Sequence, residues 1–308
     1  MRITLIAFII LSINIYSQNT YEFLRVDVSP RTAALGGSFA AVNDDADAIF
    51  YNPAGLSYLS GTPVSLSFTK YLVDINYASL AVSREFQDIG RISAGIKYVN
   101  YGTFTGRDEY GNQTTDFGVG EFAVKTSYSN FLDANLSYGV SAGFIFSKIA
   151  DYSSSAFCFD AGLNYAIPSE RINLALALVN VGSQFSPYIE TKEKLPFDIN
   201  VGVSKRLQNL PLKIYLDVHR LNNTSESFSK RLSNFSVGGE FSLSKALKVR
   251  LGYESKKRTE LKIGNFAGLA GFNLGFGLTI KSYLLNYSFS SMGQIGAIHR
   301  FGLNTSLE

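Results

Sequence analysis

Apolar and polar residues alternate with a period of two along most of the chain after position 62. In the segment 135–147, apolar residues occupy every second position from Leu136 to Phe146, and the positions between them hold mostly Ser and Gly. The segments 197–206, 212–220 and 268–281 follow the same rule. Successive side chains of a β-strand point to opposite faces, so this period predicts strands with one apolar face and one small polar face.

The alternation predicts roughly fourteen strands, joined by connections of two kinds. We expect the strands at about 62–70, 74–84, 90–101, 117–129, 135–147, 155–166, 171–181, 197–206, 212–220, 232–243, 246–255, 268–281, 283–290 and 297–307. Tight connections, such as 244–246, alternate with longer polar ones, such as 102–116 and 183–196. Short turns at one rim and long loops at the other indicate an up-and-down meander of antiparallel strands.

A soluble sandwich and a transmembrane barrel both alternate in this way, and composition favours the barrel. The polar face of a sandwich meets water and carries many Lys, Glu and Thr, whereas here it is mostly Ser, Gly and Asn. The chain has 18 Tyr and 24 Phe. Six tyrosines near predicted strand ends suit the aromatic girdles of a membrane barrel: Tyr71, Tyr77, Tyr98, Tyr101, Tyr128 and Tyr165. Lipid leaves no water for an open sheet edge, so the expected fold is all-β, a closed antiparallel transmembrane β-barrel.

The first 18 residues have the layout of a secretory signal peptide. A positive charge at Arg2 precedes an apolar run from Ile3 to Leu11, and the small residue Ser17 follows. We therefore expect an exported protein whose only cysteine, Cys158, forms no intramolecular disulfide. The formal net charge of +3 gives no reason to expect nucleic acid as a partner.

Between the signal peptide and the first predicted strand lies a segment without the barrel period, rich in small residues. Glycines permit tight backbone, Asp44 or Asp45 can cap a short helix, and an Asn-Pro pair ends it. We expect residues 31–58 to fold back into the barrel as a hatch, or plug. Its key residues are Arg31, Gly36, Gly37, Asp44, Asp45, Asn52, Pro53, Ala54 and Gly55.

The segment 23–56, FLRVDVSPRTAALGGSFAAVNDDADAIFYNPAGL, resembles the N-terminal pattern of the PorV/PorQ family of outer-membrane proteins, which are similar to FadL-type fatty-acid transporters. The C-terminal segment MGQIGAIHRFGL resembles the same family more weakly. The resemblance implies a barrel of fourteen strands with an N-terminal hatch. It also implies a role in type IX protein secretion or in attaching proteins to the cell surface.

The sequence carries no recognisable catalytic, cofactor or metal motif. Asp44, Asp45 and Asp47 could suggest calcium, but the loop glycine and distal glutamate of a calcium hand are missing, and helix capping explains them better. With two histidines and one cysteine, the spacing supports no zinc cluster. We therefore expect a non-enzymatic protein without a cofactor.

Charged residues on the polar faces of several predicted strands would point into the lumen. They are Asp198, Lys213, Asp217, Lys248, Arg250 and Glu254. Two interpretations remain open, a network of salt bridges that braces the hatch against the wall and a cluster that recognises a ligand.

These patterns predict three regions: a signal peptide at 1–18, a hatch segment at 19–60 and a barrel at 61–308. The expected location is the bacterial outer membrane, with outer-membrane lipid around the barrel. The first functional hypothesis is an accessory of protein secretion or surface attachment, with other secretion-system or surface proteins as partners. The alternative is a FadL-like uptake channel for hydrophobic compounds, with a hydrophobic ligand beside the hatch.

Overall fold

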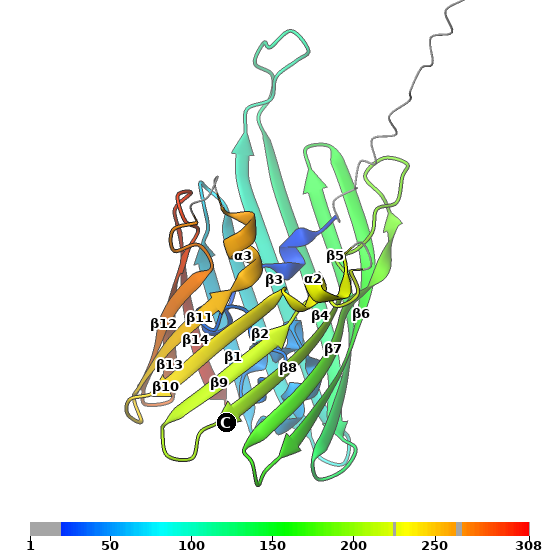
Figure 1. The fold of residues 1–308 in the computed structure, drawn as a ribbon. Helices are drawn as coiled ribbons and strands as arrows, with labels where there is room; N and C mark the ends of the chain where they lie inside the picture. Colours follow the sequence, from blue (N-terminus) through cyan, green and yellow to red (C-terminus); the bar gives the residue numbers. More distant parts are fainter. Residues whose placement is uncertain (1–19, 224–225, 263–266, 308) are drawn as a thin grey trace, which may run out of the picture.

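Fourteen antiparallel strands in the described part of the chain form a closed barrel, in which every strand pairs with its neighbours in sequence and β1 pairs with β14. The structure is a computed structural model that describes residues 20–223, 226–262 and 267–307. The predicted signal peptide lies outside the described residues. The predicted fold class, with its fourteen strands, is confirmed (Figure 1).

The strands of the first half are β1 (Thr62–Lys70), β2 (Asn76–Phe86), β3 (Gly90–Phe104), β4 (Phe117–Phe131), β5 (Leu136–Ile149), β6 (Tyr152–Ile167) and β7 (Ile172–Ser186). Those of the second half are β8 (Asp198–Arg206), β9 (Leu212–Val218), β10 (Phe235–Ser242), β11 (Leu247–Glu254), β12 (Phe272–Ile280), β13 (Tyr283–Ser291) and β14 (Ala297–Leu307). Short helices precede β1 or follow β9 and β11: η1 (Glu22–Arg25), α1 (Pro30–Ala34), η2 (Ala46–Phe50), η3 (Pro53–Tyr58), α2 (Phe228–Leu232) and α3 (Ser255–Glu260). No helix among the described residues is long and apolar enough to cross a membrane.

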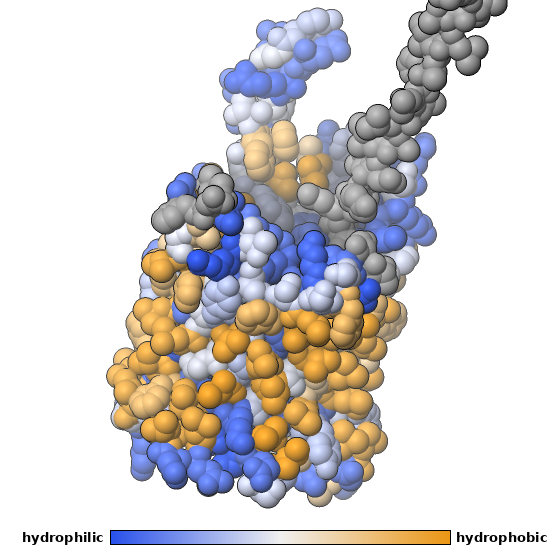
Figure 2. All heavy atoms as spheres, in the orientation of Figure 1, coloured by the Kyte–Doolittle hydropathy of each residue, from blue (hydrophilic) through white to orange (hydrophobic). Residues whose placement is uncertain are grey.

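The alternation sorts side chains as predicted, with apolar residues outside and small polar ones inside. In β5, Val140 is 49% exposed, while its neighbours Ser141 and Gly139 are buried in the lumen. Large apolar side chains exposed on nearly every strand form a belt, with polar residues above and below it (Figure 2). Such a belt is the surface that a membrane barrel presents to hydrocarbon.

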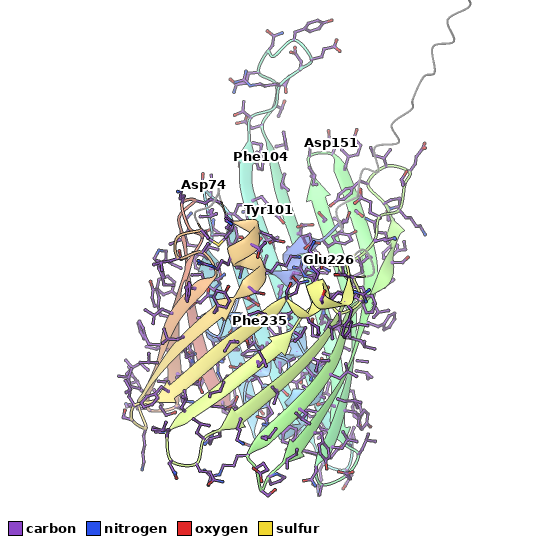
Figure 3. All side chains as sticks on the ribbon, viewed as in Figure 1. Asp74, Tyr101, Phe104, Asp151, Glu226 and Phe235 are labelled. Carbon is purple, nitrogen blue, oxygen red and sulfur yellow. The ribbon has the colours of Figure 1, made fainter. Side chains whose placement is uncertain are left out.

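The barrel wall is tall on one side and short on the other. Strands β3 to β7 have 14 to 16 residues, whereas β8 to β13 have 7 to 9. On the tall side, the β3–β4 hairpin rises far above the rim, and Phe104 lies at its base (Figure 3). On the short side, α2 and α3 lie at the upper ends of the strands (Figure 1).

Most strand boundaries agree with the predicted ones within about three residues, and the largest shifts, of three to five residues, have local causes. The strand predicted at 232–243 begins at Phe235, because residues 228–232 form α2. The strand predicted at 268–281 begins at Phe272, because Gly268 and Gly271 adopt positive φ angles in a turn before it. Strand β7 extends to Ser186, past a bulge at Asn180, and so shortens the predicted loop 183–196.

The prediction of a tyrosine girdle was wrong for three of the six residues. Tyr77 is only 5% exposed and lies inside the barrel, with Tyr71 and Tyr101 packed against the same inner cluster. A tyrosine near a strand end points outward or inward according to the strand's period of two, and its distance from the end has no influence on this. Tyr77 shares its face with Ser79 and therefore points inward.

Residues 20–61, which we call the hatch segment, run through the lumen before β1 begins. Helix α1 packs against β11 to β14, η2 against β1 to β4, and η3 against β3 to β6. The hatch segment thereby contacts most of the inner wall, and most of its residues are buried.

Candidate functional site

The motif Asn-Pro-Ala-Gly packs against two glycines of the inner wall, Gly139 and Gly162. Asn52 is fully buried, and its side-chain amide donates to the carbonyls of Ala40, at 2.8 Å, and Leu163, at 3.2 Å. Its Oδ1 accepts from the backbone N–H of Ala54, at 3.1 Å, and caps η3. Any Cβ on Gly162 of β6 would collide with Asn52.

The rest of this motif touches the wall equally closely. A Cβ on Gly139 of β5 would meet the backbone of Pro53 and Ala54. Within the hatch segment itself, a Cβ on Gly55 would meet the carbonyl of Val42. Ser137 donates a hydrogen bond to the carbonyl of Ala54, at 2.9 Å. The unusual composition of this stretch thus reflects backbone-to-backbone packing between the hatch segment and the wall.

Gly36 and Gly37 turn the chain sharply after α1. Their φ angles are +69° and +87°, values that residues with a Cβ rarely adopt. A Cβ on Gly36 would also lie 2.8 Å from the backbone N of Tyr253. Just after the turn, the N–H groups of Phe39 and Ala40 donate to Oδ2 of Asp217, at 2.8 and 2.7 Å.

Arg31 is at the centre of a buried ionic cluster between α1 and the wall. Its side chain is 5% exposed and lies within 3.2 Å of the carboxylates of Asp44, Asp45 and Glu240. Burial opposes the charge of Arg31, but these acids outweigh burial and raise its pKa further above its ordinary value. Buried ion pairs are costly to break from one side, because the remaining charge is left without a partner.

The structure places the six predicted lumen charges inside the barrel, in several groups. Lys213, Lys248 and Arg250 join the cluster around Arg31: Lys213 lies 3.9 Å from Asp44, and the other two lie 3.8 and 2.7 Å from Glu240. Asp198 pairs with Arg25 at 2.6 Å. Glu254 pairs with Lys257 of α3 at 2.6 Å.

An apolar patch on the inner wall interrupts the polar lumen near the rim with the long loops. It consists of Tyr77, Val99, Ala123, Ile145, Ala156 and Cys158, which come from β2 to β6 and are at most 5% exposed. We call these residues the luminal apolar patch. Phe23, Leu24 and Val28 of the hatch segment cover it, together with Tyr21 and Leu195.

Polar contacts at its edges hold the covering segment 21–28 in place. Lys97 of β3 donates to the carbonyls of Leu24, at 3.1 Å, and Val26, at 3.2 Å. Arg25 forms a bidentate pair with Asp198, and the hydroxyl of Tyr21 lies 2.6 Å from that of Ser154. These contacts lie around the patch, while the apolar side chains lie on it.

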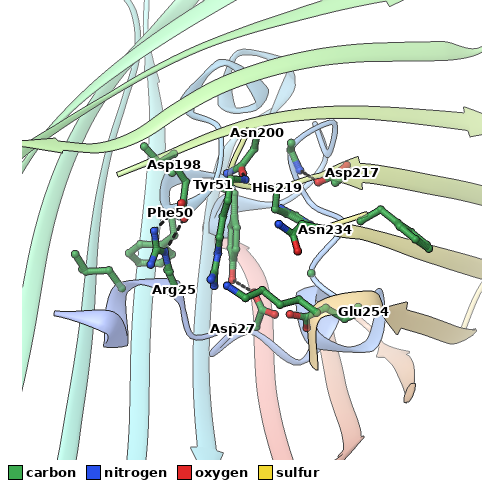
Figure 4. A pocket seen from close by; sticks show the side chains of 18 of the residues that line it. Arg25, Asp27, Phe50, Tyr51, Asp198, Asn200, Asp217, His219, Asn234 and Glu254 are labelled. Carbon is green, nitrogen blue, oxygen red and sulfur yellow. Dashed lines mark hydrogen bonds and ion pairs between the residues drawn. The ribbon is translucent and has the colours of Figure 1, made fainter. Parts of the chain in front are cut away.

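Beside the patch is a polar cavity of about 100 Å³ between the hatch segment and β7 to β11 (Figure 4). Leu24 and Phe50 line its apolar side, and Asp217, His219 and Asn200 line the opposite wall. Tyr51 donates a hydrogen bond to Asp27 within the same space, at 3.0 Å. The cavity therefore connects apolar and polar surfaces of the lumen.

Several residues of the site were missed in the sequence, including Arg25 and the luminal apolar patch, although the alternation could have found two charged ones, Lys97 and Glu240. On their strands, Lys97 lies two residues after Gly95 and Glu240 two residues after Gly238, so both side chains point to the inner face. Of the described residues, no group of three or more His, Cys, Asp or Glu side chains is arranged to hold a metal ion.

Comparisons with known proteins identify the fold. No protein-family profile matches the chain, and no curated protein sequence is significantly similar to it. The structure is similar to that of the toluene transporter TbuX of Ralstonia pickettii, with a TM-score of 0.60 and 14% identity over 91% of this chain and 98% of that one. It is also similar to the monoaromatic hydrocarbon channel CymD, with a TM-score of 0.59 and 12% identity over 92% and 98% of the two chains.

A FadL homologue of Pseudomonas aeruginosa gives a TM-score of 0.56 at 9% identity over 91% of this chain and 98% of that one. At such identities the likeness concerns the fold alone. The FadL-like part of the sequence resemblance is thus confirmed as a fold, while the PorV/PorQ part stays a prediction.

Proposed function

We propose that this protein is an outer-membrane channel that admits small hydrophobic compounds, as the alternative hypothesis from the sequence suggested. The luminal apolar patch is the observation that carries the proposal. In a lumen otherwise lined mostly by small and polar residues, an apolar surface built from five adjacent strands offers a binding surface to an apolar solute once the segment 21–28 lifts away. The similar folds of the toluene transporter TbuX and the hydrocarbon channel CymD support the same function.

The energetics of the patch favour an apolar ligand over water. Lifting Phe23 and Leu24 from the patch exposes apolar surface at a cost of roughly 1.5–3 kcal/mol for each side chain. A hydrocarbon that takes their place buries the patch again, whereas water does not. The segment 21–28 would therefore open for apolar solutes and stay closed to polar ones.

Uptake of radiolabelled toluene by cells that lack their own hydrocarbon channels tests this proposal. Cells that produce the wild-type protein should take up toluene faster than cells with an empty vector. The variant Ile145→Asn places an amide in the patch and should lower uptake about tenfold, because a buried polar group without a partner costs about 1–3 kcal/mol. The matched control is Ser141→Thr, on the same strand and the same inner face, which keeps the hydroxyl.

Equal uptake by wild-type and empty-vector cells, with folded protein in the outer membrane, would refute the proposal. Folding is checked by resistance to protease and by the heat-dependent mobility of the barrel in gels.

A second candidate function rests on the β3–β4 hairpin. Asp108 orders its tip by accepting from the backbone N–H groups of Tyr110, at 2.9 Å, and Asn112, at 2.8 Å. Tyr110 is 81% exposed at this tip. An ordered, protruding tip with an exposed tyrosine suits contact with another protein, as the secretion or surface-attachment hypothesis requires.

A further inference from the structure

The outer wall has an apolar groove of about 710 Å³ over β9 to β13. Gly239 of β10 lies at an outward position between Ile214 of β9 and Leu251 of β11. Because it has no side chain, the backbone of Gly238 and Gly239 forms the floor of the groove. The sides are formed by Leu212, Ile214, Val237, Leu251, Leu274 and Phe272. Leu251 and Leu274 are 62% and 48% exposed, so these sides belong to the apolar belt.

The hatch segment supports the floor of the groove from inside. On the lumen side, a Cβ on Gly238 would lie 2.7 Å from the carbonyl oxygen of Leu35, which follows α1. Helix α1 also packs against β11 and β12. Because this wall is a single layer of backbone backed by the hatch segment, it cannot move inward to fill the hollow.

An aromatic row and a cation lie at the upper end of the groove. Phe235, Tyr253 and Phe272 follow one another across β10, β11 and β12, with ring centroids 6.1 and 5.1 Å apart. Phe235 lies at the upper end of β10 (Figure 3). The guanidinium of Arg258 in α3 lies 5.9 Å from the Phe272 ring and donates one hydrogen bond, to the carbonyl of Gly268. Among the described residues, no carboxylate forms an ion pair with Arg258.

Helix α2 gives the same rim a second amphipathic element. Phe228 and Leu232, one turn apart, are 67% and 45% exposed, and the side chain of Lys230 between them is 66% exposed. Exposed apolar and basic side chains on one short helix are typical of the interface between hydrocarbon and headgroups.

We propose that this groove binds one acyl chain of an anionic membrane lipid, with the lipid phosphate against Arg258. An acyl chain matches an apolar groove that lies within the membrane belt. A lipid phosphate supplies the negative charge to pair with Arg258. A second copy of the chain is the competing occupant, and the oligomeric state of Gly239→Leu separates it from lipid. The inference requires only that the barrel spans a bilayer, and it is independent of what passes through the lumen.

Native mass spectrometry of the full-length protein, purified in a mild detergent, tests this lipid site. The probes are phosphatidylglycerol and phosphatidylcholine with identical acyl chains. We expect the wild-type protein to retain phosphatidylglycerol more strongly. Arg258→Gln should lower retention of phosphatidylglycerol about fivefold, the effect of one basic residue near a lipid surface, and leave phosphatidylcholine unchanged.

Gly239→Leu should lower retention of both lipids about tenfold, because it removes contact with about two methylene groups of the chain. The new side chain fits without strain, since a Cβ at Gly239 meets only Cδ1 of Leu212, at 3.6 Å. Gly118→Leu is the matched control, because that glycine of β4 has nothing within 4 Å of its Cβ position and lies far from the groove.

Two results would overturn the lipid site. One is equal retention of both lipids by the wild-type protein, Gly239→Leu and Arg258→Gln. The other is a two-chain complex that disappears in Gly239→Leu, which would assign the groove to a second copy.

Discussion

Asp47 is a buried carboxylate of the hatch segment that forms no ion pair with any described residue. It is 1% exposed, its Oδ2 accepts from the hydroxyl of Ser65 at 2.9 Å, and its Oδ1 has no hydrogen-bond partner in the described part of the chain. Burial, and then the charge of the neighbouring Asp45, raise the pKa of Asp47 to about 7. Asp45 itself caps η2 and pairs with Arg31, which Asp44 and Glu240 also engage.

This predicts a pH dependence with a definite sign. The unfolded chain releases the proton of Asp47 near pH 4, whereas the folded protein holds it up to about pH 7. The folded state therefore binds more protons in this window, and its free energy of unfolding falls as the pH rises from 4 to 7. Asp47→Asn keeps a neutral side chain at all pH values and should remove this part of the dependence.

The measurement is the midpoint of thermal unfolding in detergent between pH 5 and pH 8, for both proteins. The wild-type midpoint should fall more steeply with pH than that of Asp47→Asn. Parallel curves would show that Asp47 does not hold a proton in the folded state.

At the scale of a single strand, outward positions should not tolerate a charged side chain, because they face hydrocarbon. Leu216 of β9 is 41% exposed within the apolar belt, between the inward residues Tyr215 and Asp217. We expect Leu216→Arg to destabilise the barrel by about 2–4 kcal/mol if the position lies near the bilayer midplane. Ser141→Thr, on the inner face, should have a much smaller effect.

Both variants are refolded into lipid vesicles and unfolded with guanidinium to measure this difference. Similar free energies of unfolding for the two variants would contradict the assignment of the two faces to lipid and lumen.

At the scale of the whole molecule, the tall side of the barrel carries two separate features, the luminal apolar patch and the protruding β3–β4 hairpin. The luminal apolar patch lies on β2 to β6. The β3–β4 hairpin extends far above this part of the wall (Figure 1). Replacing residues 105–116 by a short turn should leave the barrel folded and toluene uptake unchanged, because this hairpin does not contact the patch.

The same trimmed protein separates the two candidate functions. If the hairpin binds secretion or surface proteins, they should co-purify with the wild-type protein and be lost from the trimmed one. A loss of toluene uptake without a loss of folding would instead show that the hairpin belongs to the uptake path.

Much of this architecture was predictable from local pattern. The alternation predicted every strand, the long and short connections and six of the inward charges, because the period of a strand is a property of the backbone itself. The role of Asp45 as a helix cap was also predictable, since capping depends on residues only a few positions apart. The start of β10 and the end of β7 differ from the predicted positions because of α2 and the bulge at Asn180. Both features depend on contacts outside the strand itself.

The amino-acid sequence alone therefore determined the barrel class, the two faces of its strands and the small-residue character of the hatch segment. Only the tertiary structure decided which residues meet in the lumen. Ile145 and Val99 are apolar residues at inward positions, and Phe23 covers their patch from more than 70 positions away in the chain. Such a contact depends on closure of the barrel and on the register of the strands between the two partners. No local period encodes it, so the luminal apolar patch became visible only in the folded chain.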